Sequence, residues 1–207
     1  PNLYTNSKLK SEKLVEKFYH EGIPVTIYRP GNVTCHFESG KFQTNINSNA
    51  VYRMIKSFIL LGKAPKVDAN MDFAMVDIAS KSIVALALDD QSVGKVFHIC
   101  NPHNVSYADM LSSIKSFGYP IELVDLNVYE DWLYNDNPKN QEGLELAMAG
   151  LEGDGAKNSP LVYACPATTN ALNKKGIIFP IPDEDFIHRM LTHAVEVGFL
   201  PIPKEME

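Results

Sequence analysis

Cysteine is scarce in this chain: Cys35, Cys100 and Cys165 are the three among its 207 residues. An odd number of widely separated cysteines predicts neither a disulfide framework nor a zinc site of the Cys-x-x-Cys kind. Three reduced thiols are instead typical of a protein that stays in the cytoplasm. We therefore expect the cysteines to be free and the protein to be cytoplasmic.

Concentrated positive charge and long apolar runs are missing too. The net charge is −6, and no stretch is dense in lysine and arginine, as binding to nucleic-acid phosphates or anionic lipids requires. No apolar run approaches the ~20 residues needed to cross a bilayer. The N-terminal residues also lack the basic and apolar segments of a secretion signal. The sequence thus predicts no nucleic-acid partner and no membrane association.

Motifs of hydrolytic and metal-dependent chemistry are not found either. There is no Gly-x-Ser-x-Gly elbow to present a nucleophilic serine. His188 and His193 are five residues apart, whereas paired ligands on one helix are four apart, and no further ligands accompany Cys35 and His36. His98 lies in an apolar run, and we expect it to be a hydrogen-bonded core residue. We predict no metal site.

The first part of the chain predicts a helix followed by a strand. Apolar side chains recur at helical spacing over residues 7–21, and Gly22 ends that helix. Residues 25–28 are a β-branched and aromatic run that suits a buried strand, and residues 29–32 end it in a turn. This is the repeating unit of a doubly wound sheet, in which ligands bind beyond the carboxyl ends of the strands. Residues 30–34 are therefore predicted at a ligand-binding edge, with the helix packed on the sheet.

The rest of the chain predicts more helices than strands. Helices are expected over 50–61, 78–88, 107–117, 129–134, 141–151 and 184–197, and strands over 95–100 and 121–124. Asp77 and Ser106 are placed to cap the helices that follow them. The glycine-rich run 150–155 follows a helix rather than a strand and carries two acids, so we interpret it as a surface loop and not as a phosphate-binding loop. Strands become rare beyond Asp125, and the second half is predicted to be mainly helical.

Tyr4 and Lys8 are four residues apart near the start of the first helix and therefore share one helix face. A lysine ammonium beside a phenol favours the phenolate form, which suits a tyrosine that transfers protons near neutral pH. We hypothesise that Tyr4 is a general acid and Lys8 its electrostatic partner. The same spacing recurs at Tyr52 and Lys56, in a helix that no strand end adjoins, and we interpret that second pair as structural.

Taken in order, these motifs resemble the extended short-chain dehydrogenase/reductase family and, within it, the C-terminal thioester reductase domains of nonribosomal peptide synthetases. That group has a Tyr-x-x-Ser-Lys helix, a Gly-Ile-Pro-Val strand entry, an Arg-Pro-Gly strand exit and a later Val-Asp helix start. The corresponding residues here are 4–8, 22–25, 29–31 and 76–77. The likeness is good over residues 1–105 and looser beyond them.

The resemblance implies a fold and a division of the chain. The fold class is α/β: the second half of a Rossmann-like doubly wound parallel sheet, followed by a mainly helical C-terminal substrate-binding subdomain. Residues 1–105 are expected to form the C-terminal half of an NAD(P)-binding domain. Residues 106–207 are expected to form the helical subdomain.

The resemblance also implies a reaction, the NADPH-dependent reduction of a thioester on a peptidyl or acyl carrier protein, with release of an aldehyde or alcohol. By this likeness Tyr4 donates a proton to the carbonyl oxygen, and Lys8 holds the nicotinamide ribose. The helical half accepts the phosphopantetheine arm and the peptide. The residues expected to line the nicotinamide are Pro30, Gly31, Asn32 and Val33.

Three features of that family precede its tyrosine and are absent here: the glycine-rich pyrophosphate loop, the residue that reads the ribose, and the serine or threonine that assists the tyrosine. Because the chain starts at Pro1 and enters a helix almost at once, we expect the second half of a longer reductase. Such a half is inactive without the N-terminal half, its partner, and exposes an apolar sheet edge. Two alternatives stay open. One is an extended reductase or epimerase acting on acyl-CoA or a nucleotide sugar, and the other is a non-catalytic module that docks a carrier protein.

Overall fold

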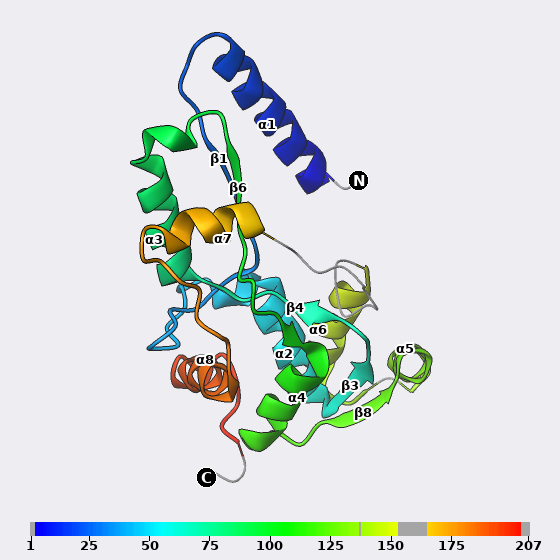
Figure 1. Cartoon of the computed structure of the whole chain (residues 1–207). Coiled ribbons are helices and arrows are strands. Elements are labelled where there is room, and N and C mark those ends of the chain that lie inside the picture. Colours follow the sequence, from blue (N-terminus) through cyan, green and yellow to red (C-terminus); the bar gives the residue numbers. More distant parts are fainter. Residues whose placement is uncertain (1–2, 137, 153–164, 204–207) are drawn as a thin grey trace.

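The computed structural model describes residues 3–136, 138–152 and 165–203 and shows an α/β protein (Figure 1). Its α-helices are α1 (Leu3–His20), α2 (Ala50–Leu61), α3 (Val76–Ala87), α4 (Tyr107–Ser116), α5 (Leu126–Asn135), α6 (Gln141–Glu152), α7 (Pro166–Asn173) and α8 (Glu184–Glu196). Its strands are β1 (Ile27–Pro30), β2 (Val33–Thr34), β3 (Lys63–Lys66), β4 (Asn70–Met71), β5 (Ala74–Met75), β6 (Val96–Ile99), β7 (Val105–Ser106) and β8 (Glu122–Asp125). Short 3-10 turns are η1 (Ile46–Ser48) and η2 (Asp90–Ser92).

The strands pair mainly in parallel, as the predicted α/β class requires. β1 pairs with β6 from Ile27 opposite Val96 to Pro30 opposite Ile99. β2 pairs in parallel with β5, and β3 with β8, whereas β4 and β7 are antiparallel. Because parallel strands end at the same edge of a sheet, the loops that follow β1 and β6 lie next to each other.

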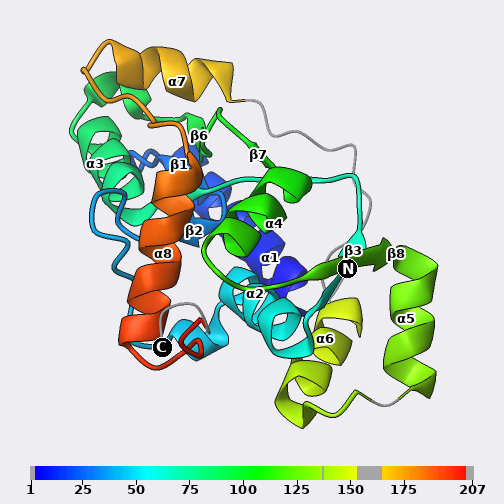
Figure 2. The same ribbon diagram turned by 90° about the horizontal axis from the view of Figure 1, so that it is seen from below.

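Two apolar clusters hold these elements together. The larger one is built on α2, α4 and α8, which lie at one end of the molecule (Figure 1), with α5 and α6 at its border (Figure 2). The smaller one lies between α3, β6 and α7 and contains Ala79, Leu86, Phe97, Ile99, Leu172 and Phe179. The other pair of four-residue strands, β3–β8, adjoins α5 and lies away from β1–β6 (Figure 2). The start of α2 is defined locally, because the Asn49 side chain accepts hydrogen bonds from the N–H groups of Val51 and Tyr52.

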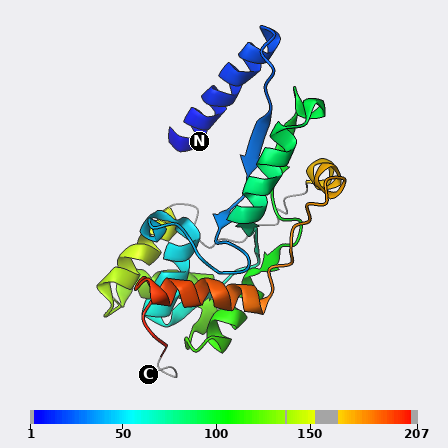
Figure 3. The same ribbon diagram turned by 90° about the vertical axis from the view of Figure 1, so that its left-hand side faces the viewer.

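Helix α1 flanks β1 on the side opposite α3, so that the strand has a helix on each side (Figure 3). Unlike α3, however, α1 has no buried residue, and Leu9 and Leu14 on its apolar face are 54% and 52% exposed. An ion pair between Glu12 and Arg29 joins the helix to β1. The expectation that this helix packs its apolar face on the sheet is therefore wrong for the described residues.

The strand next to α1 is also less buried than predicted. β1 begins at Ile27, two residues later than expected, and its residues are half-buried or exposed. His98 is exposed rather than part of the core, and its ring nitrogen lies 3.3 Å from the Arg29 guanidinium. The reason is the alternation of β6, where Phe97 and Ile99 point into the small cluster and His98 points to the open side.

The expectations for the helix ends are confirmed in part. Ser106 caps α4 by accepting from the N–H of Asp109, as predicted. Asp77 does not cap α3, because α3 begins at Val76 and Asp77 lies inside its first turn. The Asp77 carboxylate accepts instead from the N–H of Phe37. Strand β3 and helix α7 were not predicted. Of the glycine-rich run, residues 150–152 end α6, and the rest lies outside the described residues.

All three cysteines are buried and free, as predicted. Burial raises the pKa of the Cys35 thiol to about 11 and that of Cys100 to about 12. Thiols held in their neutral form are poor nucleophiles and poor metal ligands. As for the membrane, no helix in the described part of the chain is both long and apolar enough to span a bilayer.

Candidate active site

A cavity of about 420 Å³ opens where β1 ends. Its wall comes from the first turn of α1, the loop after β1, the segment leading into α2, and the start of α3. The lining residues are Tyr4, Pro30, Gly31, Asn32, Val33, Thr34, Phe42, Gln43, Asn49, Ala50, Val51 and Val76. The structure thus brings Tyr4 together with all four residues that were expected to line a nicotinamide.

Tyr4 and Lys8 lie on one face of α1, as their spacing predicts. The Lys8 ammonium is 5.4 Å from the centre of the Tyr4 ring. Tyr4 is 68% exposed, so its hydroxyl is open to a ligand that enters the cavity. Lys8 is not among the residues that line the cavity, and it lies one turn further along the helix. The catalytic roles of both residues remain predictions.

The backbone of the loop after β1 is fixed at three points. The N–H of Gly31 donates to the carbonyl of Ile99 at 3.0 Å, which extends the β1–β6 ladder by one residue. The carbonyl of Asn32 accepts from the N–H of Ala74 at 3.0 Å. The N–H of Asn32 donates to the Asp72 carboxylate at 3.2 Å. A loop held in this way presents a rigid backbone surface to the cavity.

Thr34 lines the cavity, at the end of the stretch 30–34 that was predicted at a ligand-binding edge, although the sequence analysis did not name it as a site residue. It is fully buried, and its hydroxyl oxygen has no hydrogen-bond partner. A buried hydroxyl without a partner loses its interactions with water and gains nothing in return. No sequence pattern marks it, because threonine in a strand is ordinary and the missing partner is visible only in three dimensions.

Replacing Thr34 by valine is therefore expected to stabilise the free protein by about 1 kcal/mol, since the unpartnered hydroxyl is removed while the shape is kept. Urea unfolding of both proteins measures the difference. The matched control is Thr26→Val, because the Thr26 hydroxyl donates to the carbonyl of Ser92 at 3.0 Å. The control is expected to lose stability, and equal losses in both variants would contradict the interpretation of Thr34.

The second tyrosine–lysine pair is structural, as predicted. Tyr52 is 1% exposed and its ring packs against Phe42 and Phe199. Burial raises the pKa of its phenol, which keeps the group neutral. The Lys56 ammonium forms an ion pair with Glu142 at 2.5 Å and lies over the Phe199 ring. Neither side chain reaches the cavity.

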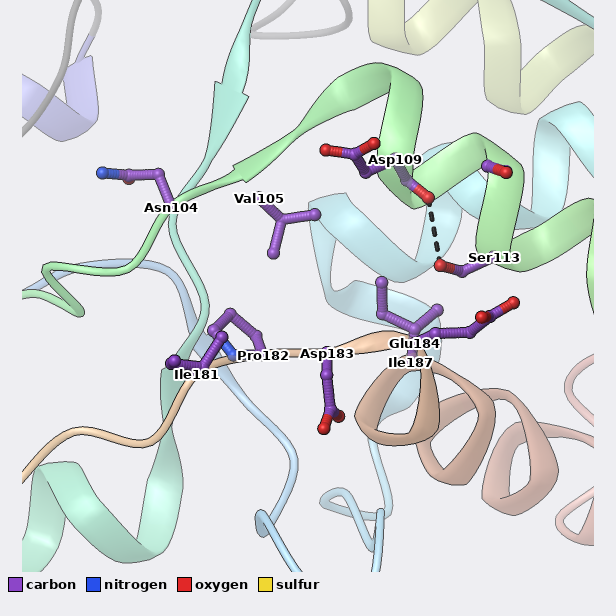
Figure 4. Close-up of a pocket in the computed structure, with 10 residues that line it drawn as sticks. Asn104, Val105, Asp109, Ser113, Ile181, Pro182, Asp183, Glu184 and Ile187 are labelled. Carbon is purple, nitrogen blue, oxygen red and sulfur yellow. Dashed lines mark hydrogen bonds between the residues drawn. The ribbon is translucent and has the colours of Figure 1, made fainter.

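A second cavity, of about 390 Å³, lies between α4 and the start of α8 (Figure 4). It is lined by three acidic residues, each of which already has a partner. Asp109 accepts from the Ser106 hydroxyl, Asp183 caps α8 through the N–H of Phe186, and Glu184 is bonded to Ser116. Within the described residues no group of three metal-binding side chains occurs. Each of these three carboxylates therefore already stabilises the local structure.

The first cavity fits the nicotinamide end of a dinucleotide cofactor. It combines a rigid glycine-containing loop at the end of a parallel strand, where such ligands bind, with an accessible tyrosine and a nearby lysine. It does not fit the whole cofactor. Within the described residues no glycine-rich turn joins a strand to a helix N-terminus, which the pyrophosphate requires.

Comparisons with known proteins agree with this geometry. The NAD-binding family described as "Male sterility protein" matches residues 1–83. A linear gramicidin synthase polypeptide from Brevibacillus parabrevis is 32% identical over 202 residues, which are 96% of this chain and 4% of that protein. The large subunit of the L-2-aminoadipate reductase from Candida glabrata is 27% identical over 131 residues, which are 62% of this chain and 9% of that protein. The chain thus spans a small part of the curated relatives it matches.

Solved structures give the same result. The terminal R domain of the myxalamid PKS-NRPS biosynthetic pathway has a TM-score of 0.86 and 32% identity, covering 97% of this chain and 51% of that one. A thiolation-reductase di-domain from an archaeal non-ribosomal peptide synthetase has a TM-score of 0.79 and 27% identity, covering 96% and 41%. The chain belongs to the extended short-chain dehydrogenase/reductase family, among the terminal reductase domains of nonribosomal peptide synthetases.

Proposed function

We propose that this chain is the C-terminal half of an NADPH-dependent thioester reductase domain, which releases a carrier-bound acyl or peptidyl group as an aldehyde or alcohol. The observation that carries the proposal is the meeting of Tyr4 and the Pro30–Val33 backbone around one cavity, in a chain related to terminal reductase domains. The choice of NADPH over NADH rests on the resemblance alone.

The residues of this chain have distinct tasks in such a reaction. Bound NADPH supplies the hydride that reduces the carbonyl carbon of the thioester. The Tyr4 hydroxyl donates a proton to the carbonyl oxygen, which becomes more basic as the carbon is reduced. The hemithioacetal formed in this way then gives up its hydroxyl proton, the carbon–sulfur bond breaks, and the carrier leaves as its free thiol while the aldehyde is released. The Lys8 ammonium stabilises the phenolate that Tyr4 leaves behind and holds the nicotinamide ribose. The rigid loop from Pro30 to Val33 fixes the distance between the nicotinamide and the substrate.

The proposal includes two protein partners. One is a carrier protein with a phosphopantetheine-linked substrate, which is supported by the thiolation-reductase di-domain among the related structures. The other is the N-terminal half of the same reductase domain, which supplies the pyrophosphate loop. The exposed apolar face of α1 and the unburied β1 are where that half packs. The division of the chain at residue 105 and a cytoplasmic location are part of the proposal.

NADPH fluorescence titration of a polypeptide that joins this chain to its N-terminal half tests the proposal. We expect micromolar binding for the joined polypeptide, a typical range for a cofactor. The isolated residues 1–207 are expected to bind at least about a hundredfold more weakly, because the pyrophosphate contacts are missing. A joined polypeptide that binds no NADPH would exclude both redox functions. Binding of a phosphopantetheinylated carrier by that same polypeptide would then favour the docking module.

A further inference from the structure

Asp72 is a buried carboxylate that the predicted reaction does not use. It lies between β4 and β5, and it is 4% exposed. Burial raises its pKa, and hydrogen bonds from the N–H groups of Asn101 and Asn32 oppose that rise. An ionised carboxylate is expensive to bury without such partners. A carboxylate buried at this place therefore indicates that the backbone around Asn32 and Asn101 has to be held in position.

The two N–H donors belong to the two loops that end β1 and β6. One carboxylate oxygen of Asp72 accepts from Asn32 at 3.2 Å, and the other accepts from Asn101 at 2.9 Å. Because β1 and β6 are parallel neighbours, these loops emerge side by side. The carboxylate thus bridges them immediately beyond the last pair of the ladder.

Gly31 shows how closely the loop is fitted to this carboxylate. A Cβ atom on Gly31 would lie 1.7 Å from the Asp72 oxygen and 3.3 Å from the Cys100 sulfur. The absence of a side chain at this position is what lets the carboxylate reach the N–H of the next residue. The Gly31 backbone therefore lies against the Asp72 carboxylate. The same residue also lines the cavity.

Asn101 extends the connection to the C-terminal part of the chain. Its side chain is fully buried, and its amide donates to the carbonyls of Phe73 and Pro180 at 3.1 and 3.0 Å. Pro180 lies in the segment that leads into α8. Asp72 and Asn101 together therefore join the cavity loop to the helical part, and we call this pair the carboxylate–amide clasp.

We propose that Asp72 is a positioning residue of the reductase, and that the carboxylate–amide clasp holds the Gly31–Asn32 backbone at the level where it supports the nicotinamide ring. The inference rests on the proposed function, because it assigns that loop to the cofactor. Asp72 does not touch the reacting atoms. It acts through the two backbone N–H groups that it fixes.

Asp72→Asn tests this inference in the joined reductase domain. Asparagine keeps the size of the side chain but offers one acceptor oxygen, so one of the two loops loses its bond. A nicotinamide displaced by a fraction of an ångström is expected to lower kcat by about 10–100-fold. The Kd of NADPH is expected to change by less than about threefold, because most cofactor contacts lie elsewhere. The fluorescence of the bound nicotinamide is expected to change in parallel with kcat.

Asp89→Asn is the matched control. Asp89 also accepts a backbone N–H, that of Gln91, and pairs with Lys175 at 2.7 Å, but it lies at the far end of α3. It is expected to leave kcat and nicotinamide fluorescence unchanged. If Asp72→Asn does not fold, Asn101→Ser serves instead, since it keeps both backbone bonds to Asp72 and removes the amide bonds to Phe73 and Pro180. A loss of kcat with unchanged Kd is expected there too, because the loop after β6 that Asp72 binds is then no longer anchored to Phe73 and Pro180. Wild-type kcat in that variant would contradict the role of the clasp.

The outcomes separate the two proposals. If the wild-type domain reduces thioesters and the folded variant keeps its kcat and its nicotinamide fluorescence, Asp72 is only a structural residue and the inference is wrong. A variant that merely melts at a lower temperature leads to the same conclusion. If the wild-type domain neither binds NADPH nor reduces a thioester, the proposed function fails first, and the positioning role falls with it.

Discussion

Tyr4→Phe is expected to lower thioester reduction by the joined reductase domain by about 10²–10⁴-fold, the usual contribution of a positioned proton donor. The ring is kept, so its packing and the contact with Lys8 at 5.4 Å stay possible. NADPH binding is expected to be nearly unchanged, because the phenol contributes little to the cofactor's total contacts. Steady-state assays of kcat, together with a fluorescence titration, measure both effects.

Tyr19→Phe provides the control on the same helix. Tyr19 lies near the other end of α1 and is 42% exposed, so removing its hydroxyl is expected to leave kcat unchanged. If Tyr4→Phe retains wild-type activity, the role of Tyr4 as general acid is wrong. Equal losses in the two variants would instead indicate a general effect on α1.

Gly40→Ala is expected to lower the free energy of unfolding of the chain by about 3 kcal/mol or more, the sum of an overpacked contact and a left-handed backbone. Gly40 has a φ of +65°, and a Cβ there would lie 2.1 Å from the carbonyl oxygen of Arg189 and 3.0 Å from the N–H nitrogen of Met190. Both neighbours are backbone of α8 and cannot rotate away. Urea unfolding followed by near-ultraviolet circular dichroism measures the loss.

Gly176→Ala separates the two contributions. Gly176 has a similar φ of +71°, but no heavy atom lies within 4 Å of the position of its Cβ. Its substitution is expected to cost only about 1–2 kcal/mol, from the left-handed backbone alone. If both alanine variants lose the same stability, the contact of Gly40 with α8 is not what makes glycine necessary there.

The sequence predicted the helices best where apolar spacing and terminal signals agreed. The helix expected over 50–61 occurs as α2, and its end at Gly62 has the left-handed backbone that favours glycine, with a φ of 66°. Ser106 before α4 shows the same agreement. These features are local, since the cap and the helix it ends are neighbours in the chain.

Elements that depend on distant partners were predicted less well. Strand β3 contains Pro65, which is typical of a turn, yet β3 pairs with β8, which lies nearly sixty residues further on. Proline is tolerated because a short strand with one partner leaves an N–H unbonded in any case. His98 was mispredicted for a similar reason, since an apolar run does not say which of its faces is covered.

The sequence motifs predicted residues that line the cavity, but they did not predict the residues that hold those in place. Tyr4, Lys8 and the Pro30–Val33 loop each lie in a short recognisable stretch, and the structure brings all but Lys8 to the wall of the cavity. Asp72 lies in no such stretch, and Thr34 lies at the end of the predicted edge without any sign in the sequence that its hydroxyl has no partner. Asp72 is important because its carboxylate joins two loops, and Thr34 because its buried hydroxyl has no hydrogen-bond partner. Both are properties of the folded chain.

The exposure of helix α1 affects how often Tyr4 and Lys8, the proposed catalytic pair, lie side by side. A helix of 18 residues with no buried side chain has little more than its intrinsic helix propensity to hold it, and such helices are only partly formed in water. Tyr4 and Lys8 share a face only in the fraction of molecules in which the first turns are wound. The apparent affinity for any ligand that needs the pair falls by that same fraction. A surface that packs on Leu9 and Leu14 therefore increases the population of competent sites without touching the chemistry.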